Sequence, residues 1–174
     1  MWVWAHLVVG YIAYLFARPS AIRHGDRHAV LAALLASVLP DLIDKPLAWG
    51  VQLLPSGRSA AHSVFALVLV SGAVWVLARK HGRREAGIAF PIGYGSHLAS
   101  DAVVPLYHGA YDELGYLLWP LSSAPEYDEP TSVLGALREL PELSTLFLAE
   151  LVFALALGCL CLYHLLTRTD FTGQ

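Results

Sequence analysis

The chain has 174 residues, of which 56% are hydrophobic and only 14% are charged, and its mean hydropathy is +0.54. A soluble domain of this size carries roughly 25% charged residues, so the composition excludes an ordinary soluble globule. The abundance of apolar residues also excludes a disordered chain, and the net charge of −3 argues against a nucleic-acid partner. At this length we expect a single domain over residues 1–174.

Long apolar runs divide the chain into segments that approach the roughly 20 residues a helix needs to cross a bilayer. The runs cover about residues 2–17, 29–43, 60–78, 86–105 and 144–166. They predict an all-α fold, an integral membrane helical bundle with about five transmembrane or membrane-embedded helices, of which the first two are short. Gly87, Gly95 and Ala99 form a stripe of small residues on the fourth run, which predicts close helix packing there.

Basic residues are concentrated in the first and third connections and in the tail. Most of the 11 Lys and Arg residues lie there, namely Arg18, Arg23, Arg27, Arg79, Lys80, Arg83, Arg84 and Arg168. Because basic connections stay in the cytoplasm, this pattern predicts an inner (cell) membrane protein with its N-terminus outside and its C-terminus cytoplasmic. The acidic connection at about 106–143 then lies outside, where its apolar pieces predict short interfacial helices and a lid-like segment.

Ionisable side chains inside the apolar runs are functional candidates, because burying them in a membrane is costly. Six of them lie near the outer ends of four expected helices: His6, Asp41, Asp44, His62, His97 and Asp101. At 1.5 Å of rise per residue, all six fall within roughly 10 to 15 Å of the outer boundary. His97 and Asp101 are four residues apart and share a helix face, as do Arg58 and His62 if the third helix begins near residue 57. The pattern predicts one cluster that faces the extracytoplasmic side.

Three imidazoles and three carboxylates without a thiolate form a nitrogen and oxygen ligand set, which suits zinc best and manganese or iron next. Six ligands are enough for one or two ions. Taken singly, each part also has an ordinary interpretation. His6 suits an interfacial position, and Asp41 with Asp44 suits a solvated turn. His97 with Asp101 suits a buried hydrogen-bonded pair, but the common depth on four helices favours a metal site.

Several sequence pieces resemble the membrane-bound metal-dependent hydrolases of the YdjM type. They are His6, residues 39–44 (LPDLID), 58–63 (RSAAHS), 95–101 (GSHLASD) and 118–121 (LWPL). This family is similar, more remotely, to zinc-dependent phospholipase C and P1-type nucleases, which are all-helical phosphodiesterases with a His-x-x-x-Asp pair. The resemblance implies phosphoester chemistry. This chain has Gly57 where many relatives carry a His, and it lacks the extra ligands of three-zinc enzymes, so one or two ions are expected.

The residues and the resemblance together predict a membrane-bound metal-dependent hydrolase. It would cleave a phosphoester of a membrane lipid or lipid-linked substrate at the outer interface with a metal-activated water. Asp44 or Asp101 would orient or deprotonate that water, and Arg58 would bind a phosphate oxygen. Two other classes stay open: a metal or proton transporter, and a non-catalytic membrane scaffold with a structural metal. The apolar inner halves of the third and fifth expected helices argue against a transmembrane path.

Overall fold

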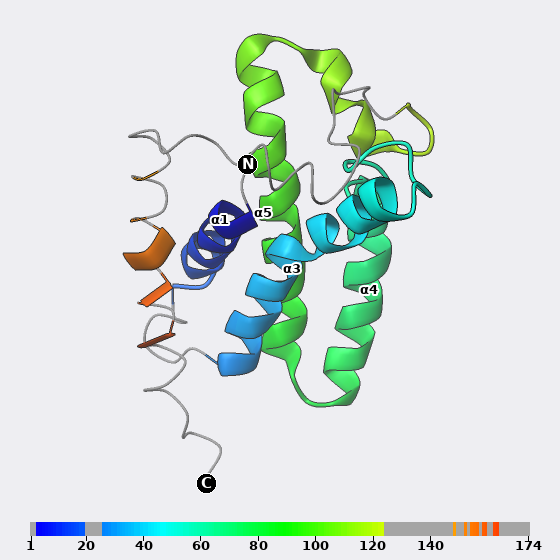
Figure 1. The fold of residues 1–174 in the computed structure, drawn as a ribbon. Coiled ribbons are helices and arrows are strands. Elements are labelled where there is room, and N and C mark those ends of the chain that lie inside the picture. Colours follow the sequence, from blue (N-terminus) through cyan, green and yellow to red (C-terminus); the bar gives the residue numbers. More distant parts are fainter. Residues whose placement is uncertain are drawn as a thin grey trace, which may run out of the picture.

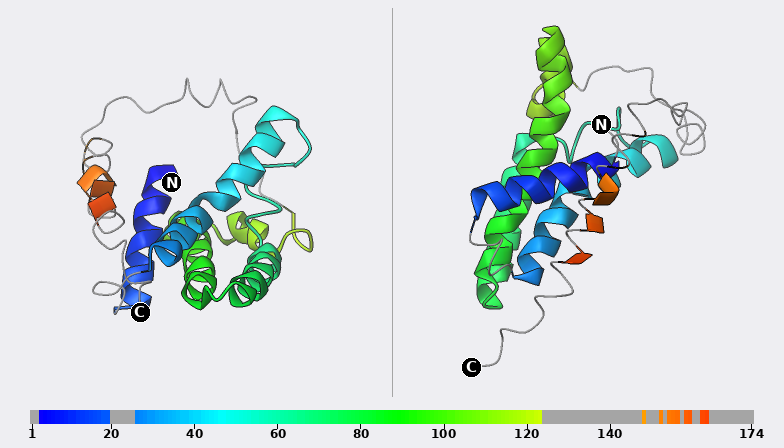
Figure 2. Two further views of the ribbon diagram at one scale, coloured as in Figure 1. Left: turned by 90° about the horizontal axis from the view of Figure 1, so that it is seen from below. Right: turned by 90° about the vertical axis from the view of Figure 1, so that its left-hand side faces the viewer.

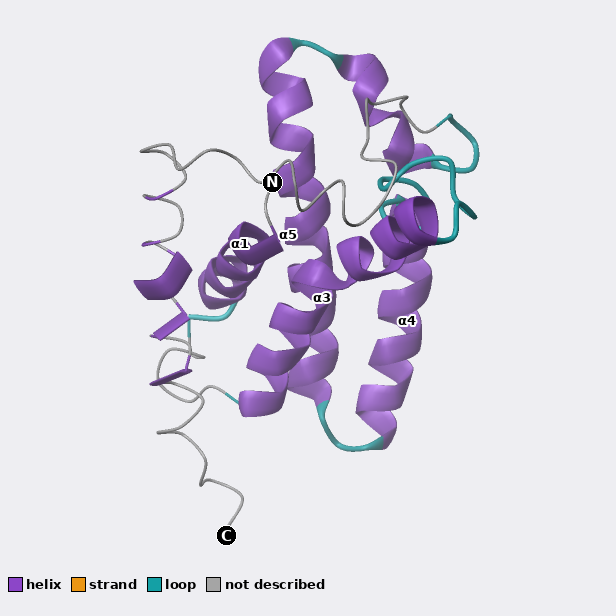
Figure 3. Cartoon of the chain, in the orientation of Figure 1, coloured by secondary structure: helices purple, strands orange, loops and turns teal. Residues whose placement is uncertain are grey.

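A computed structural model describes residues 3–19 and 26–123, together with a few positions between 148 and 163. Every regular element in these residues is a helix, which confirms the all-α prediction (Figures 1 and 3). The elements are α1 (Val3–Ala17), α3 (Arg27–Lys45), the π-helix η1 (Pro46–Gly50), α4 (Val64–Lys80), α5 (Arg84–His108) and the 3-10 helix η2 (Tyr111–Leu118).

Four of the five apolar runs coincide with helices whose boundaries are shifted. α4 begins four residues after the start of the predicted run at 60–78, and α5 extends past the end of its run to His108. The run at 144–166 and most of the predicted lid at 106–143 lie outside the described residues, but η2 is one short helix of the kind predicted for the lid. None of the described helices has both the length and the apolar character needed to cross a bilayer.

The helix ends have local causes in the sequence. The Asp26 side chain accepts the His28 amide at the start of α3, and the Ser63 hydroxyl accepts the Ala66 amide at the start of α4. α5 ends at Gly109, which adopts a left-handed conformation with φ of 69°. These caps set where α3 and α4 begin and where α5 ends.

α5 is the central helix, because it packs against α1, α3 and α4, while α3 also packs against α1. α4 and α5 run antiparallel side by side, and α1 lies across α5 at a steep angle (Figure 2). Buried Tyr11 and Tyr14 of α1 pack against Ala33 of α3 and Ala89 of α5 in one part of the core. The steep crossing brings the first turns of α1 against the second half of α5.

Two glycines determine how closely α5 approaches its neighbours. A Cβ at Gly93 would overlap the backbone carbonyl of Ala33 in α3, and a Cβ at Gly87 would come within 2.8 Å of the Trp75 ring in α4. A Cβ added to Gly95 would have no neighbouring atom within 4 Å. The predicted stripe is therefore correct at Gly87 and wrong at Gly95, because α3 contacts α5 along a line that passes through Gly93.

One end of the molecule collects most of the described basic residues, whereas Lys45 and Arg58 pair with Asp41 and Asp101 elsewhere. Arg18 forms a two-point ion pair with Glu85, with N–O distances of 2.7 and 2.8 Å, and so joins the end of α1 to the start of α5. The start of α3 and the turn between α4 and α5 lie together at the lower end in Figure 1. The described ends of the first connection and the turn between α4 and α5, predicted to share one side of a membrane, thus lie at one end of the fold (Figure 1).

Candidate metal centre

Five buried side chains converge in the middle of the fold. His6 comes from α1, Asp41 from α3, His62 from the segment before α4, and both His97 and Asp101 from α5. Each of the five residues is at most 4% exposed. Their ligand atoms form two overlapping groups, His6 with Asp41 and His97, and His62 with His97 and Asp101, and within each group the atoms lie within 4.8 Å of one another. The structure thus brings together five of the six predicted metal ligands, which we call the histidine cluster.

The His62 and His97 rings point their Nε2 atoms at each other across 3.0 Å. The Nδ1 atom of His97 lies 2.7 Å from the Ser37 carbonyl, and Nδ1 of His62 lies 2.8 Å from a carboxylate oxygen of Asp44. Both oxygens accept, so each ring carries a proton on Nδ1 and directs Nε2 into the cluster. The 3.0 Å separation is close to the roughly 3.3 Å between two nitrogens bound to one tetrahedral zinc ion.

Asp44 lies behind His62 and organises the segment that carries it. Its carboxylate accepts the backbone amides of Ser59 at 2.9 Å, Ala61 at 2.9 Å and His62 at 3.2 Å, as well as the His62 ring. These amides are used by a carboxylate of another helix and are unavailable to a helical turn. Arg58 and His62 would share a helix face only if the third helix began near residue 57; α4 begins at Val64 instead, and both residues belong to an irregular segment.

Asp101 connects the cluster to α1 and to the irregular segment. Its Oδ1 lies 3.3 Å from Nε2 of His6, and its Oδ2 lies 2.9 Å from Nε of Arg58. Nδ1 of His6 lies 3.0 Å from the Ser100 hydroxyl, and the His6 ring stacks on the His97 ring with centroids 3.9 Å apart. His6 is therefore held against α5 on two sides of its ring.

Asp41 provides the second carboxylate of the cluster. Its Oδ1 lies 2.8 Å from Nζ of Lys45, one turn later in α3, and 3.5 Å from Nε2 of His62. The side chains of Lys45 and Arg58 are 25% and 26% exposed, whereas those of Asp41 and Asp101 are both 2% exposed. Each buried carboxylate is thus paired with a cation that reaches the surface.

The donor set fits a divalent cation. A buried polar atom that makes no hydrogen bond is costly. Oδ2 of Asp41 is such an atom within the described chain, and Nε2 of His6 makes no hydrogen bond there beyond its 3.3 Å ionic contact with Oδ1 of Asp101; both atoms belong to the histidine cluster. Three imidazole nitrogens and two carboxylates match the preferences of zinc, manganese or iron. These buried His and Asp groups could therefore hold a metal ion.

Several supporting residues were missed by reasoning from the sequence. The Tyr94 hydroxyl donates to the Ala61 carbonyl across 2.6 Å and so fixes the irregular segment to α5. Ser37 and Ser100 position His97 and His6. Only Lys45 had a usable signal, namely its spacing of four residues after Asp41 on one helix.

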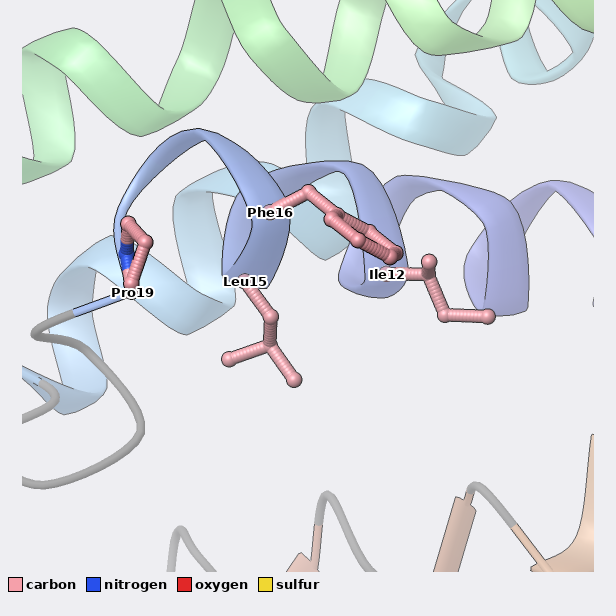
Figure 4. A pocket seen from close by; sticks show the side chains of 4 residues that line it. All are labelled: Ile12, Leu15, Phe16 and Pro19. Carbon is pink, nitrogen blue, oxygen red and sulfur yellow. The ribbon is translucent and has the colours of Figure 1, made fainter.

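An open hollow elsewhere on the molecule contrasts with the histidine cluster. It has a volume of about 520 Å³ and is lined by Ile12, Leu15, Phe16 and Pro19 at the end of α1 (Figure 4). These side chains carry no group that could bind a metal or transfer a proton. This hollow therefore offers no second metal or proton-transfer site.

The family model described as YdjM inner membrane protein matches residues 1–168. No curated protein and no solved structure gives a significant match. The family match covers every residue of the histidine cluster, and its description supports a membrane location without naming a reaction. The predicted hydrolase activity and the remote likeness to phospholipase C and P1 nuclease gain no support from the comparisons.

Proposed function

The chain belongs to the YdjM inner membrane protein family, and we propose that it is a membrane-bound metal-dependent hydrolase. Its proposed substrate is a phosphoester of a membrane lipid or lipid-linked compound. The observation that carries this proposal is the convergence of three imidazoles and two carboxylates, all buried, with two of their polar atoms lacking hydrogen bonds in the described part of the chain. Zinc is the proposed ion, with manganese or iron as the next choices, and one or two ions are bound.

The proposed location is the inner membrane, with the N-terminus outside, the C-terminus cytoplasmic and the site near the extracytoplasmic side. The exposed apolar surface of α4 supports contact with lipid, since these side chains are 41% to 73% exposed: Val64, Phe65, Val68, Leu69, Val76 and Leu77. The separation of the cluster from the basic end supports the orientation. His97 lies twelve residues along α5 from Glu85, which is roughly 18 Å of helix.

The proposed ligands are His6, Asp41, His62, His97 and Asp101. A bound divalent ion supplies a water that is activated near neutral pH and a charge that stabilises the phosphoryl oxygens. The ligand geometry is set by hydrogen bonds to the far sides of the rings. Asp44 accepts a hydrogen bond from Nδ1–H of His62, and the Ser37 carbonyl accepts one from Nδ1–H of His97. The Nε2 lone pair of each ring therefore stays available to an ion.

The other polar residues have distinct proposed roles. Of the two carboxylates predicted to take a proton from the attacking water, Asp101 is better placed, because it faces the histidines while Asp44 is enclosed by N–H donors. We therefore assign Asp44 to positioning His62. The Arg58 guanidinium adjoins Asp101 and suits a phosphate oxygen of the substrate, because guanidinium binds such oxygens with paired hydrogen bonds.

Metal content tests this proposal directly. We expect detergent-purified protein, prepared with added zinc and manganese, to hold one or two equivalents of metal by elemental mass spectrometry. Asp101→Ala and His62→Ala should lose the metal. His108→Ala should keep it, because His108 is exposed at the end of α5, the helix that carries Asp101. Metal-loaded wild type should then release product from at least one phospholipid in a phosphoester panel, and Asp101→Ala should not.

The outcomes separate the proposed hydrolase from the other two classes. Absence of metal from the wild type contradicts the metal centre. Bound metal that resists chelator, with no hydrolysis of any phosphoester, indicates a scaffold with a structural ion, an outcome that the burial of all five ligands makes worth testing. Metal uptake into sealed vesicles that contain the protein indicates a transporter.

A further inference from the structure

We propose that Lys45 and Arg58 form a phosphate-binding pair that is released by the metal ion. In the metal-free chain the two cations neutralise Asp41 and Asp101, and when an ion takes their place they bind a phosphate-monoester group. This inference rests on the proposed metal centre. It adds Lys45 to the site and makes metal binding and anion binding mutually dependent.

The two ion pairs have the same arrangement. Nζ of Lys45 lies 2.8 Å from Oδ1 of Asp41, and Nε of Arg58 lies 2.9 Å from Oδ2 of Asp101. In each pair the acid side chain is 2% exposed and the cation is about a quarter exposed, at 25% and 26%. The negative charges therefore lie inside and the positive charges lie toward the surface.

The oxygens that the cations occupy are the ones that face the imidazoles. Oδ1 of Asp41 lies 3.5 Å from Nε2 of His62 and 3.9 Å from Nε2 of His97. Oδ2 of Asp101 lies 3.8 and 3.9 Å from the same two nitrogens. An ion bound to these nitrogens would compete with Lys45 and Arg58 for the same two oxygens, and its charge would repel both cations.

The Trp49 ring lies near Lys45 and near the residue that precedes Arg58. Nζ of Lys45 lies 5.7 Å from the centroid of the Trp49 ring, and the same ring lies so close to Gly57 that an added Cβ would come within 3.1 Å of it. Gly57 directly precedes Arg58. Both cations are about a quarter exposed and each pairs with a cluster carboxylate, and an ammonium and a guanidinium suit the negative charge and the acceptor oxygens of a phosphate dianion.

Thermodynamic linkage gives the inference a quantitative form. If the metal frees the two cations, it raises the affinity for phosphate, and phosphate raises the affinity for the metal by the same factor. Couplings of this kind typically amount to roughly 5- to 150-fold. Removing either cation should abolish the gain and should also tighten metal binding in the absence of phosphate, because one competitor for a carboxylate is gone.

Isothermal titration calorimetry on the full-length chain in detergent tests these expectations. Zinc is titrated into wild type, Lys45→Met, Arg58→Met and the control Lys80→Met, an exposed cation at the end of α4. Inorganic phosphate is then titrated with and without zinc. We expect zinc to tighten phosphate binding at least fivefold in wild type and control. The two variants should lose that gain and bind zinc more tightly than wild type. A misfolded variant would instead bind zinc more weakly, so the direction of the change separates the two causes.

A second arm identifies the source of the phosphate group. Mixed micelles that contain phosphatidic acid replace inorganic phosphate, and micelles of phosphatidylcholine, a diester, serve as the comparison. Zinc-dependent binding of inorganic phosphate or of phosphatidic acid, lost in both variants, supports the pair and shows whether free phosphate or a lipid monoester is its ligand.

Three results would overturn the inference. Phosphate and phosphatidic acid affinities that are independent of zinc contradict the coupling. A zinc-dependent gain that both variants retain shows that phosphate binds to the ion and not to the cations. In both cases zinc binding by wild type leaves the proposed metal centre intact, whereas wild type that binds no zinc removes the metal centre and the inference together.

Discussion

Asp41 and Asp44 are three residues apart in one helix, and yet the fold gives their carboxylates different chemistry. Asp41 has an oxygen that accepts no hydrogen bond from the described residues, while Asp44 accepts three backbone amides and the His62 ring. A carboxylate whose oxygens already accept several hydrogen bonds has few lone pairs left to bind an ion, but it fixes the orientation of the imidazole that it contacts. We therefore expect Asp44 to influence metal binding only through His62.

Replacing Asp44 tests this role. In Asp44→Asn one acceptor oxygen becomes an NH₂ group that faces N–H donors, so we expect the free energy of unfolding to fall by about 1 to 3 kcal/mol. Metal affinity should fall roughly 10- to 100-fold, because His62 loses its orienting partner. Chemical denaturation and zinc titration measure the two effects. Asp112→Asn, an exposed carboxylate in η2, is the control, and wild-type zinc affinity in Asp44→Asn would contradict the role.

At this scale the sequence indicated which residue types meet but not which atoms face which. Spacing and common depth predicted the five residues of the histidine cluster and also Asp44, which lies behind His62, whereas the helical spacing of Arg58 and His62 does not occur. The difference between Asp41 and Asp44 depends on backbone amides of residues 59–62, fifteen or more positions away. No local pattern could indicate where those amides point.

Among the elements, α3 and α5 make the contact on which the cluster depends, because α3 carries Asp41 and α5 carries His97 and Asp101. Their approach is controlled at Gly93, where any Cβ would overlap the Ala33 carbonyl. A substitution there must push the helices apart and with them the two sides of the cluster. Packing between helices and ligand geometry are thus linked at one residue.

Two alanine substitutions in α5 separate this packing effect from helix propensity. Gly93→Ala should destabilise the protein by about 1 to 3 kcal/mol through overpacking and should weaken zinc binding. Gly95→Ala, in open space two residues later, should be neutral or stabilise by up to about 1 kcal/mol, because alanine favours a helix. Denaturation midpoints and zinc titrations of both variants measure the difference. Equal behaviour of the two would show that the Ala33 contact does not limit the fold.

Apolar runs predicted the helices well, because burial of a helix face leaves a long apolar stretch in the sequence. They failed at residues 60–63, which are apolar enough to extend the third run but lie outside α4. There the amides of Ala61 and His62 are captured by Asp44, and Ser63 caps the helix that follows. A side chain from a distant helix overrides the local preference, which sequence periodicity cannot reveal.

For the whole molecule, the histidine cluster is the place where α1, α3, α5 and the irregular segment meet. An ion held by all of them binds the folded chain and not the unfolded one, and so stabilises the fold by mass action. At a free concentration one hundred times its dissociation constant this amounts to about 2.7 kcal/mol.

Thermal unfolding in detergent should therefore depend on metal. We expect zinc to raise the midpoint of wild type by about 5 to 10 °C relative to chelator-treated protein, given roughly 2 to 4 °C per kcal/mol at this chain length. His97→Ala should show no such shift, and His81→Ala, exposed in the turn between α4 and α5, should behave as wild type. A wild-type midpoint that is the same with zinc and with chelator would contradict the metal centre.

The position of His97 and Asp101 on α5 also has a consequence for biosynthesis. The five residues of the histidine cluster appear in the growing chain in the order 6, 41, 62, 97 and 101. A nascent chain that stops before α5 holds one imidazole on α1, one in the irregular segment and a single carboxylate of the cluster, and it lacks the helix against which His6 stacks. The ribosome must therefore have passed residue 101 before the complete cluster exists, so we expect any ion to bind only after α5 has been synthesised.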